Sequence, residues 1–130
     1  MKYGLCFLFL SVIPLSMAWS ANEQTIKQWS ENEPEGVTCV RTDRNIDGKA
    51  DYLLRYSEDG NKIYEEQDFN YDGSMDDFYF YKEGILTLRE VDSNYDGLVD
   101  LRVYLHKGVY IEKYERDTDF DGKFDLVKQF

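Results

Sequence analysis

Aspartate-rich segments of nine residues occur four times in this chain, at residues 43–51, 68–76, 92–100 and 117–125. Each segment reads D-x-[ND]-x-D-G-x-x-D, and the segments start 25, 24 and 25 residues apart. Oxygen-bearing side chains at positions 1, 3, 5 and 9, with a glycine at position 6 that permits a sharp bend, are what a hard divalent cation takes from one short loop. Chance does not place this pattern four times at one spacing. The sequence therefore predicts four metal-binding loops, numbered loop 1 to loop 4 in chain order.

In every loop, the predicted ligands are the side chains at positions 1, 3, 5 and 9 and the backbone carbonyl at position 7, whose side chain is then free to vary. They are Asp43, Asn45, Asp47, Lys49 and Asp51; Asp68, Asn70, Asp72, Ser74 and Asp76; Asp92, Asn94, Asp96, Leu98 and Asp100; and Asp117, Asp119, Asp121, Lys123 and Asp125. Several hard oxygens in a flexible loop suit calcium better than magnesium, and the loops lack the histidine and cysteine that zinc and copper prefer. We expect up to four calcium ions (Ca²⁺), bound at roughly 10⁻⁵ to 10⁻³ M. The alternative is ordinary Asp-Gly turns, but such turns need no aspartate at positions 1, 3 and 9.

The loops resemble those of EF-hand proteins in the run D-x-[DN]-x-D-G, with two departures. Position 12 is never glutamate, and the flanking segments read as strands instead of helices. The residues at position 12 are Leu54, Tyr79, Val103 and Lys128. The loops are more similar to the β-hairpin calcium loops of integrin-type FG-GAP repeats, where D-x-N-x-D-G-x-x-D precedes an apolar strand. The resemblance covers the loops and the strand after each. It does not extend to a propeller, because a repeat of 24 or 25 residues holds two strands and a blade needs four.

Runs rich in β-branched and aromatic residues flank every loop. The runs before the loops are 37–41, 62–67, 85–91 and 109–116, and those after them are 52–56, 78–81, 101–105 and 126–130. Short connections make consecutive strands antiparallel neighbours, and each repeat has no room for a helix. The sequence therefore predicts an all-β antiparallel meander of about eight strands, either a single twisted sheet or a closed up-and-down barrel. All four loops are expected along one edge, about 9 to 10 Å apart.

Alternation along the strands predicts which residues face a core. We expect that face to hold the first, third and fifth residues after each loop, most of which are apolar or aromatic. They are Tyr52, Leu54, Tyr56, Asp77, Tyr79, Tyr81, Leu101, Val103, Leu105, Leu126, Lys128 and Phe130. Position 4 of each loop is also apolar or aromatic, and these four residues either form a ladder beside the metals or each pack under their own loop. They are Ile46, Tyr71, Tyr95 and Phe120.

Residues 1–18 have the pattern of a cleaved secretory signal peptide. Lys2 precedes an apolar run over residues 5–15, and Ser16 and Ala18 are the small residues before the cleavage site. Cleavage after Ser20 is the second choice, and the run is short for a transmembrane anchor, which is the alternative. We expect a flexible polar linker over 19–36, with one helical turn around 25–29, and a repeat domain over 37–130. The protein is then secreted or periplasmic, with no membrane span after signal removal.

Composition limits the partners. The net charge is −11, and the ligand positions account for thirteen of the 26 acidic residues, three in each of the first three loops and four in the last. A chain without a basic stripe is not expected to bind nucleic acid. Cys39 is the one cysteine outside the signal segment, so it is either a buried apolar residue or half of an intermolecular bridge.

We expect a structural or interaction module whose repeats are stapled by calcium, with a protein or glycan partner at the cell envelope. Phe78, Phe80 and Tyr104 are either contact residues for that partner or ordinary core. The alternative is a secreted hydrolase acting on polysaccharide or phosphate, with calcium in a structural role. The remaining acids sit on repetitive strand faces and His106, the single histidine, sits at a turn, so no catalytic residue and no enzyme is expected. Calcium sensing is not expected, because it would need a helix pair that opens and the repeats have no room for helices.

Overall fold

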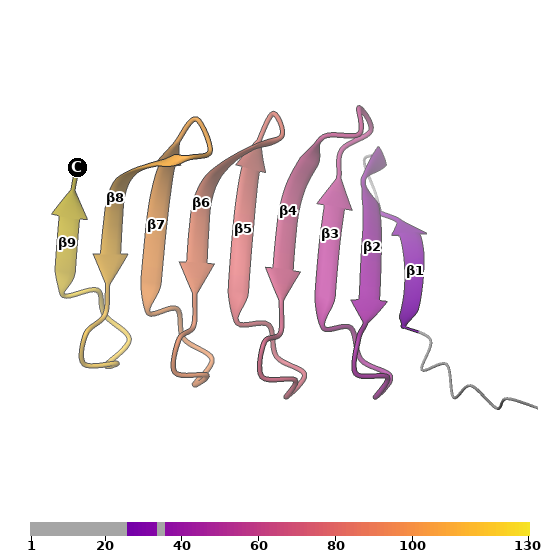
Figure 1. The fold of residues 1–130 in the computed structure, drawn as a ribbon, viewed down its shortest axis with the longest axis horizontal. Helices are drawn as coiled ribbons and strands as arrows, with labels where there is room; N and C mark the ends of the chain where they lie inside the picture. Colours follow the sequence, from indigo (N-terminus) through magenta and orange to yellow (C-terminus); the bar gives the residue numbers. More distant parts are fainter. Residues whose placement is uncertain (1–25, 34–35) are drawn as a thin grey trace, which may run out of the picture.

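A computed structural model describes residues 26–33 and 36–130, and the predicted signal peptide lies outside these residues. The described residues form nine strands in one antiparallel sheet, and the strand order equals the chain order (Figure 1). The strands are β1 (Lys27–Asn32), β2 (Thr38–Asp43), β3 (Tyr52–Tyr56), β4 (Lys62–Gln67), β5 (Asp77–Lys82), β6 (Ile85–Val91), β7 (Leu101–His106), β8 (Tyr110–Arg116) and β9 (Leu126–Gln129). The predicted all-β meander is confirmed. The sheet is open and not closed into a barrel, and β1 and β9 are its two outer strands.

The segment 27–32 forms a strand, where the sequence predicted a linker with a helical turn. β1 pairs with β2 from Lys27 opposite Asp43 to Asn32 opposite Thr38. In the connection that follows, the Glu33 N–H donates to the Val37 carbonyl at 2.7 Å. The linker and helix predictions are wrong here, because pairing along β2 satisfies backbone groups that one isolated helical turn leaves free. The sheet thus begins at Lys27 and not at residue 37.

Two sets of connections alternate along the sheet. Figure 1 shows the four acidic loops along one edge and the short hairpin turns along the other. In two of those turns, Glu83–Gly84 and Lys107–Gly108, both residues have positive φ, at 53° and 77° and at 54° and 72°. Such turns match the twist of the strands that they connect. The loops therefore lie on one edge, as the repeat spacing predicted.

The sheet is a single layer, so its described residues have no core of the usual kind (Figure 1). The fully buried hydrophobic side chains among them are Cys39 and Leu53, at 0% and 1% exposure. Both lie on the face opposite the one predicted to pack in a core, since Leu53 pairs with Arg41 while Leu54 pairs with Val40. The core prediction is therefore wrong. Alternation sorted the residues onto two faces, but no described segment covers either face.

Cys39 is a buried residue, which is the first of the two roles predicted for it. Its thiol is free and buried, and burial raises its pKa. Trp29, which lies on β1, stands opposite Arg41 on the same face of the sheet.

Polar contacts between neighbouring strands stabilise the sheet where an apolar core is missing. Glu65 on β4 is buried, and it accepts hydrogen bonds from Tyr52 of β3 at 2.8 Å and from Tyr81 of β5 at 2.9 Å. Asp77 on β5 is fully buried and accepts from Arg89 of β6 at 2.6 Å. A hydrogen bond to a charged partner contributes about 1.5 to 3 kcal/mol. Glu65 thus links the three strands β3, β4 and β5, and Asp77 links β5 to β6.

Candidate metal centre

Backbone hydrogen bonds place the bases of the loops in a regular row. The N–H of position 1 in one loop donates to the carbonyl of position 9 in the loop before it. These bonds are Asp68 to Asp51, Asp92 to Asp76 and Asp117 to Asp100, each 2.8 Å long. Position 9 in turn donates to the residue before position 1 of its own loop, as Asp100 does to Val91 at 2.8 Å. Each loop is therefore fixed both at its own neck and to its neighbour.

The aspartate at position 1 is buried and organises the loop backbone. In loop 3, Asp92 accepts from the Tyr95 N–H at 2.7 Å through Oδ1 and from the Gly97 N–H at 2.7 Å through Oδ2. The same pair of bonds is made by Asp43 in loop 1 and Asp68 in loop 2. The sequence predicted these carboxylates only as metal ligands. The structure shows that they also bind the amides of the bend.

Positions 3 and 5 form a second layer of contacts nearer the solvent. In loop 3, Asn94 Oδ1 accepts from the Asp96 N–H at 3.0 Å, and Asp96 Oδ1 accepts from the Leu98 N–H at 2.9 Å. Asn94 Nδ2 donates to Asp96 Oδ2 at 2.8 Å. The side chains at positions 3 and 5 are thus turned toward the inside of the loop.

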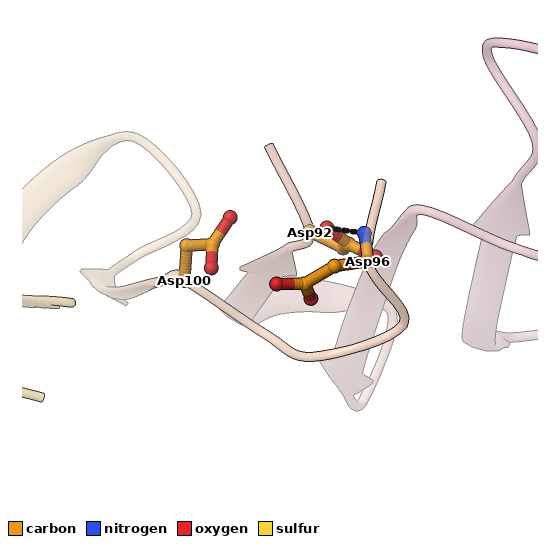
Figure 2. Close-up of side chains that lie close together, drawn as sticks. All are labelled: Asp92, Asp96 and Asp100. Atoms are coloured by element: carbon orange, nitrogen blue, oxygen red, sulfur yellow. Dashed lines mark hydrogen bonds between the residues drawn. The ribbon is translucent and has the colours of Figure 1, made fainter. Parts of the chain in front are cut away.

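Position 9 presents an oxygen to the loop interior. Asp100 Oδ2 accepts from the Ser93 N–H at 2.7 Å and from the Asn94 N–H at 3.2 Å. Its other oxygen, Oδ1, accepts no hydrogen bond from the described residues. Figure 2 shows the carboxylates of Asp96 and Asp100 facing each other across the loop, with Asp92 beside Asp96. One oxygen of Asp100 is therefore left without a hydrogen bond from the described residues, in a loop where carboxylate oxygens of Asp92, Asp96 and Asp100 lie within 4.8 Å of one another.

Two of the four loops bring three carboxylates close together. Oxygens of Asp92, Asp96 and Asp100 in loop 3 all lie within 4.8 Å of one another, and so do oxygens of Asp117, Asp119 and Asp121 in loop 4. Loops 1 and 2 share the backbone hydrogen bonds, but in the described chain their acidic side chains do not gather as closely. In loop 4, Asp125 stands outside the group, because Thr118 donates to both of its oxygens, at 2.9 and 2.6 Å.

The donors in loops 3 and 4 fit a hard divalent cation. All are carboxylate or amide oxygens, with no sulfur or imidazole within the loops. The charges also oppose one another. In loop 4, loss of solvation and repulsion from Asp121 raise the pKa of Asp119. In loop 2, burial, with repulsion from Asp68 and Asp72, likewise raises the pKa of Asp76. Carboxylates in this situation gain from a cation between them.

The residues at position 4 do not form a ladder along the loops, which was one of the two arrangements that the sequence allowed. All four have left-handed backbone conformations, with φ of 64°, 61°, 63° and 59° from loop 1 to loop 4. The side chains of Tyr71, Tyr95 and Phe120 are 47%, 50% and 42% exposed. None belongs to a pair of contacting rings among the described residues. Position 4 therefore turns the backbone so that its N–H reaches the aspartate at position 1.

Sequence reasoning missed the role of position 7. Its side chain was predicted to be free to vary, yet in two loops it reaches the next loop. Lys49 Nζ lies 3.3 Å from the Asp72 carbonyl oxygen. Leu98 lies against loop 4, where a Cβ on Gly122 would be 3.3 Å from Leu98 Cδ1. The expected spacing of about two strands between loops, together with the long side chains at these positions, could have indicated such contacts.

Comparisons with known proteins leave the family open. No protein-family model and no curated protein matches the chain. One similar solved structure is described as accessory secretory protein 1, 2 and 3 of Streptococcus pneumoniae, with a TM-score of 0.49 and 14% identity. The match covers 71% of this chain and 17% of that chain, so this chain spans a small part of its length. At this distance the likeness indicates no function, and the resemblance of the loops to EF-hand and FG-GAP loops rests on their residues alone. The described residues contain no helix able to cross a membrane.

Proposed function

We propose that the protein is an exported calcium-binding β-repeat protein, in which ions bound in the loops staple one edge of the sheet. The observation that supports this most directly is the gathering of Asp92, Asp96 and Asp100 within 4.8 Å in an oxygen-only loop. Calcium accepts several oxygens in flexible geometry, whereas magnesium demands a stricter octahedron. The export assignment is supported by the signal-peptide pattern of residues 1–18.

The single-layer sheet gives the ions a structural task. Each loop joins two strands, as loop 3 joins β6 to β7, and its aspartates come from both ends of the connection. An ion bound by Asp92 and Asp100 would therefore clamp the two strands at their ends. It would also neutralise charges that repel one another in the folded chain. Binding to the folded state alone stabilises that state.

We further propose an interaction role without catalysis. Strand carboxylates that could serve as acid or base are engaged in contacts between side chains. Glu90 accepts from Arg102 at 2.5 Å, and Glu115 accepts from Lys113 at 2.8 Å. A contact surface is supported at the β8–β9 end of the sheet, where Val109, Tyr110 and Phe130 are 73%, 66% and 70% exposed. In this proposal these side chains form part of a contact site for a protein or glycan at the cell envelope.

Removing one central ligand tests the metal assignment. Asp96→Ala is expected to lower the calcium stoichiometry by about one, measured by isothermal titration calorimetry, since position 5 supplies a carboxylate to the ion. Asp59→Ala removes an exposed acid from the turn on the opposite edge and serves as the control. Unchanged stoichiometry in Asp96→Ala, or an equal loss in Asp59→Ala, contradicts the proposal.

A further inference from the structure

The side chain of Lys49, at position 7 of loop 1, crosses to loop 2. Its Nζ donates to the backbone carbonyl of Asp72, which is position 5 of that loop, at 3.3 Å. A Cβ on Gly73 would lie 2.3 Å from Lys49 Nζ and 2.7 Å from its Cδ. The lysine thus lies over the bend of loop 2 and uses the space that a glycine leaves. A residue of another loop thus holds an ammonium group against the backbone of loop 2, where it makes no ion pair with a carboxylate of the described residues.

The negative charge of loop 2 attracts both the Lys49 ammonium group and a metal ion. The ammonium group already supplies part of the positive charge that the carboxylates attract, and it repels an ion that enters the loop. Because the contact lies near the surface, the repulsion is reduced by water and salt but not abolished. The backbone carbonyl of Asp72 is also drawn to the ammonium group.

Loop 3 lacks this arrangement. The position 7 residue of the preceding loop is Ser74, which is too short to cross, and a Cβ on Gly97 would meet nothing within 4 Å. Neither loop 2 nor loop 3 has a side chain in a salt bridge among residues 26–33 and 36–130, so the contact of Lys49 with the loop 2 backbone is what distinguishes the two loops. In loop 4, Lys123 Nζ approaches Asp121 Oδ2 of its own loop at 3.1 Å, but Asp119 adds a further carboxylate there.

We propose that Lys49 is a built-in counter-ion of loop 2, which weakens cation binding there so that loop 3 fills before loop 2. This inference rests on the proposed function of the loops as cation sites. It makes Lys49 a residue that sets the order of binding along the sheet edge. Loops with nearly the same aspartates then differ through the position 7 side chain of their neighbour.

The chain carries its own reporters for a test. Loop 2 has a tyrosine at position 4, Tyr71, and loop 3 has Tyr95, whereas loops 1 and 4 have Ile46 and Phe120. Terbium(III) occupies oxygen-rich calcium sites and luminesces when a nearby tyrosine is excited. The signal lost in Tyr71→Phe therefore reports loop 2, and the signal lost in Tyr95→Phe reports loop 3. Calcium added afterwards displaces the terbium and gives the order for calcium itself.

We expect the loop 3 signal to reach its midpoint at a lower terbium concentration than the loop 2 signal. Lys49→Met and Lys49→Gln should each lower the loop 2 midpoint roughly three- to tenfold and leave loop 3 unchanged. Lys82→Met, at the turn end of β5, removes the same charge from the opposite edge and is expected to move neither midpoint.

The outcomes separate the two proposals. Equal midpoints for loops 2 and 3, or a loop 2 midpoint that both Lys49 variants leave unchanged, overturn the counter-ion role while the loops remain cation sites. A shift of the same size in Lys82→Met also overturns it, because net charge would then explain the change. Absence of any signal attributable to Tyr71 or Tyr95 overturns the proposed function itself.

Discussion

The aspartates of each loop divide into two groups by burial. In loops 1 to 3, those at positions 1 and 9, such as Asp92 and Asp100, are buried and bind backbone amides, so they hold the bend together. In loop 4 the aspartate at position 1 is buried, whereas Asp125 at position 9 is exposed. The residue at position 5, such as Asp96, is exposed. One loop sequence therefore specifies both a shape and a charge. A buried carboxylate that is already hydrogen-bonded needs little rearrangement when a cation approaches its remaining oxygen.

A single buried carboxylate on a strand should matter as much as one in a loop. Asp77→Ala is expected to destabilise the sheet by about 1.5 to 3 kcal/mol, because it removes a buried carboxylate that is hydrogen-bonded to the Arg89 guanidinium. The measurement is the free energy of unfolding in urea, with Asp59→Ala as the control. A loss below about 0.5 kcal/mol, the usual range for surface changes, would show that the contact between Asp77 and Arg89 is dispensable.

Neighbouring strands are joined by side chains that reach across the sheet. Tyr64 of β4 and Phe80 of β5 meet edge to face with ring centroids 5.2 Å apart, and Tyr104 of β7 donates to Glu115 of β8 at 3.0 Å. Burial, and then the hydrogen bond to a carboxylate, raises the pKa of these tyrosines, as burial and Asp77 raise the pKa of Tyr79 to about 12. These contacts hold the sheet without a second layer. They also make its stability sensitive to pH.

Glu65 predicts the direction of that sensitivity. Burial opposes its ionisation, but hydrogen bonds from Lys62, Tyr52 and Tyr81 lower its pKa below the ordinary 4.5. A carboxyl whose pKa is lower in the folded state stabilises the protein above its unfolded pKa, and this contribution is lost as pH falls through the folded pKa.

Glu65→Gln should therefore be less stable than the wild type at pH 7, and the difference should shrink as pH falls below about 4.5. Urea unfolding in chelator across pH 3 to 7 measures it. A difference that stays constant over this range would assign the loss to packing and not to charge.

The described part of the molecule is one thin sheet, and the chain as a whole is acidic. Its net charge of −11 is concentrated on the loop edge, and the described residues form a single sheet without a covering layer. Repulsion along one edge opposes folding, and the few fully buried apolar side chains offset it only in part. Cations at that edge would remove the repulsion and fix the strand ends together.

Chelation is therefore expected to lower the melting temperature, and saturating calcium to raise it. At a thousandfold excess over the dissociation constant, each filled site adds about 4 kcal/mol to the free energy of unfolding. Thermal melts followed by far-ultraviolet circular dichroism, with and without chelator, measure the change. An equal concentration of magnesium is the control, and a melting temperature that ignores calcium contradicts the stapling role.

The repeat, the loops and the strands that flank them follow from the sequence alone, because glycine, aspartate and β-branched residues act through local backbone preferences. The meander also follows, since short connections permit only neighbouring antiparallel strands. Local pattern could not show β1, which forms because β2 offers it an edge, nor the missing core, because alternation separates two faces without saying what covers them. Only the tertiary arrangement shows that Lys49 reaches Asp72 and that loops 3 and 4 gather three carboxylates more closely than loops 1 and 2. The first depends on the distance between neighbouring loops and the second on how the side chains of one loop are placed, and residue types alone determine neither.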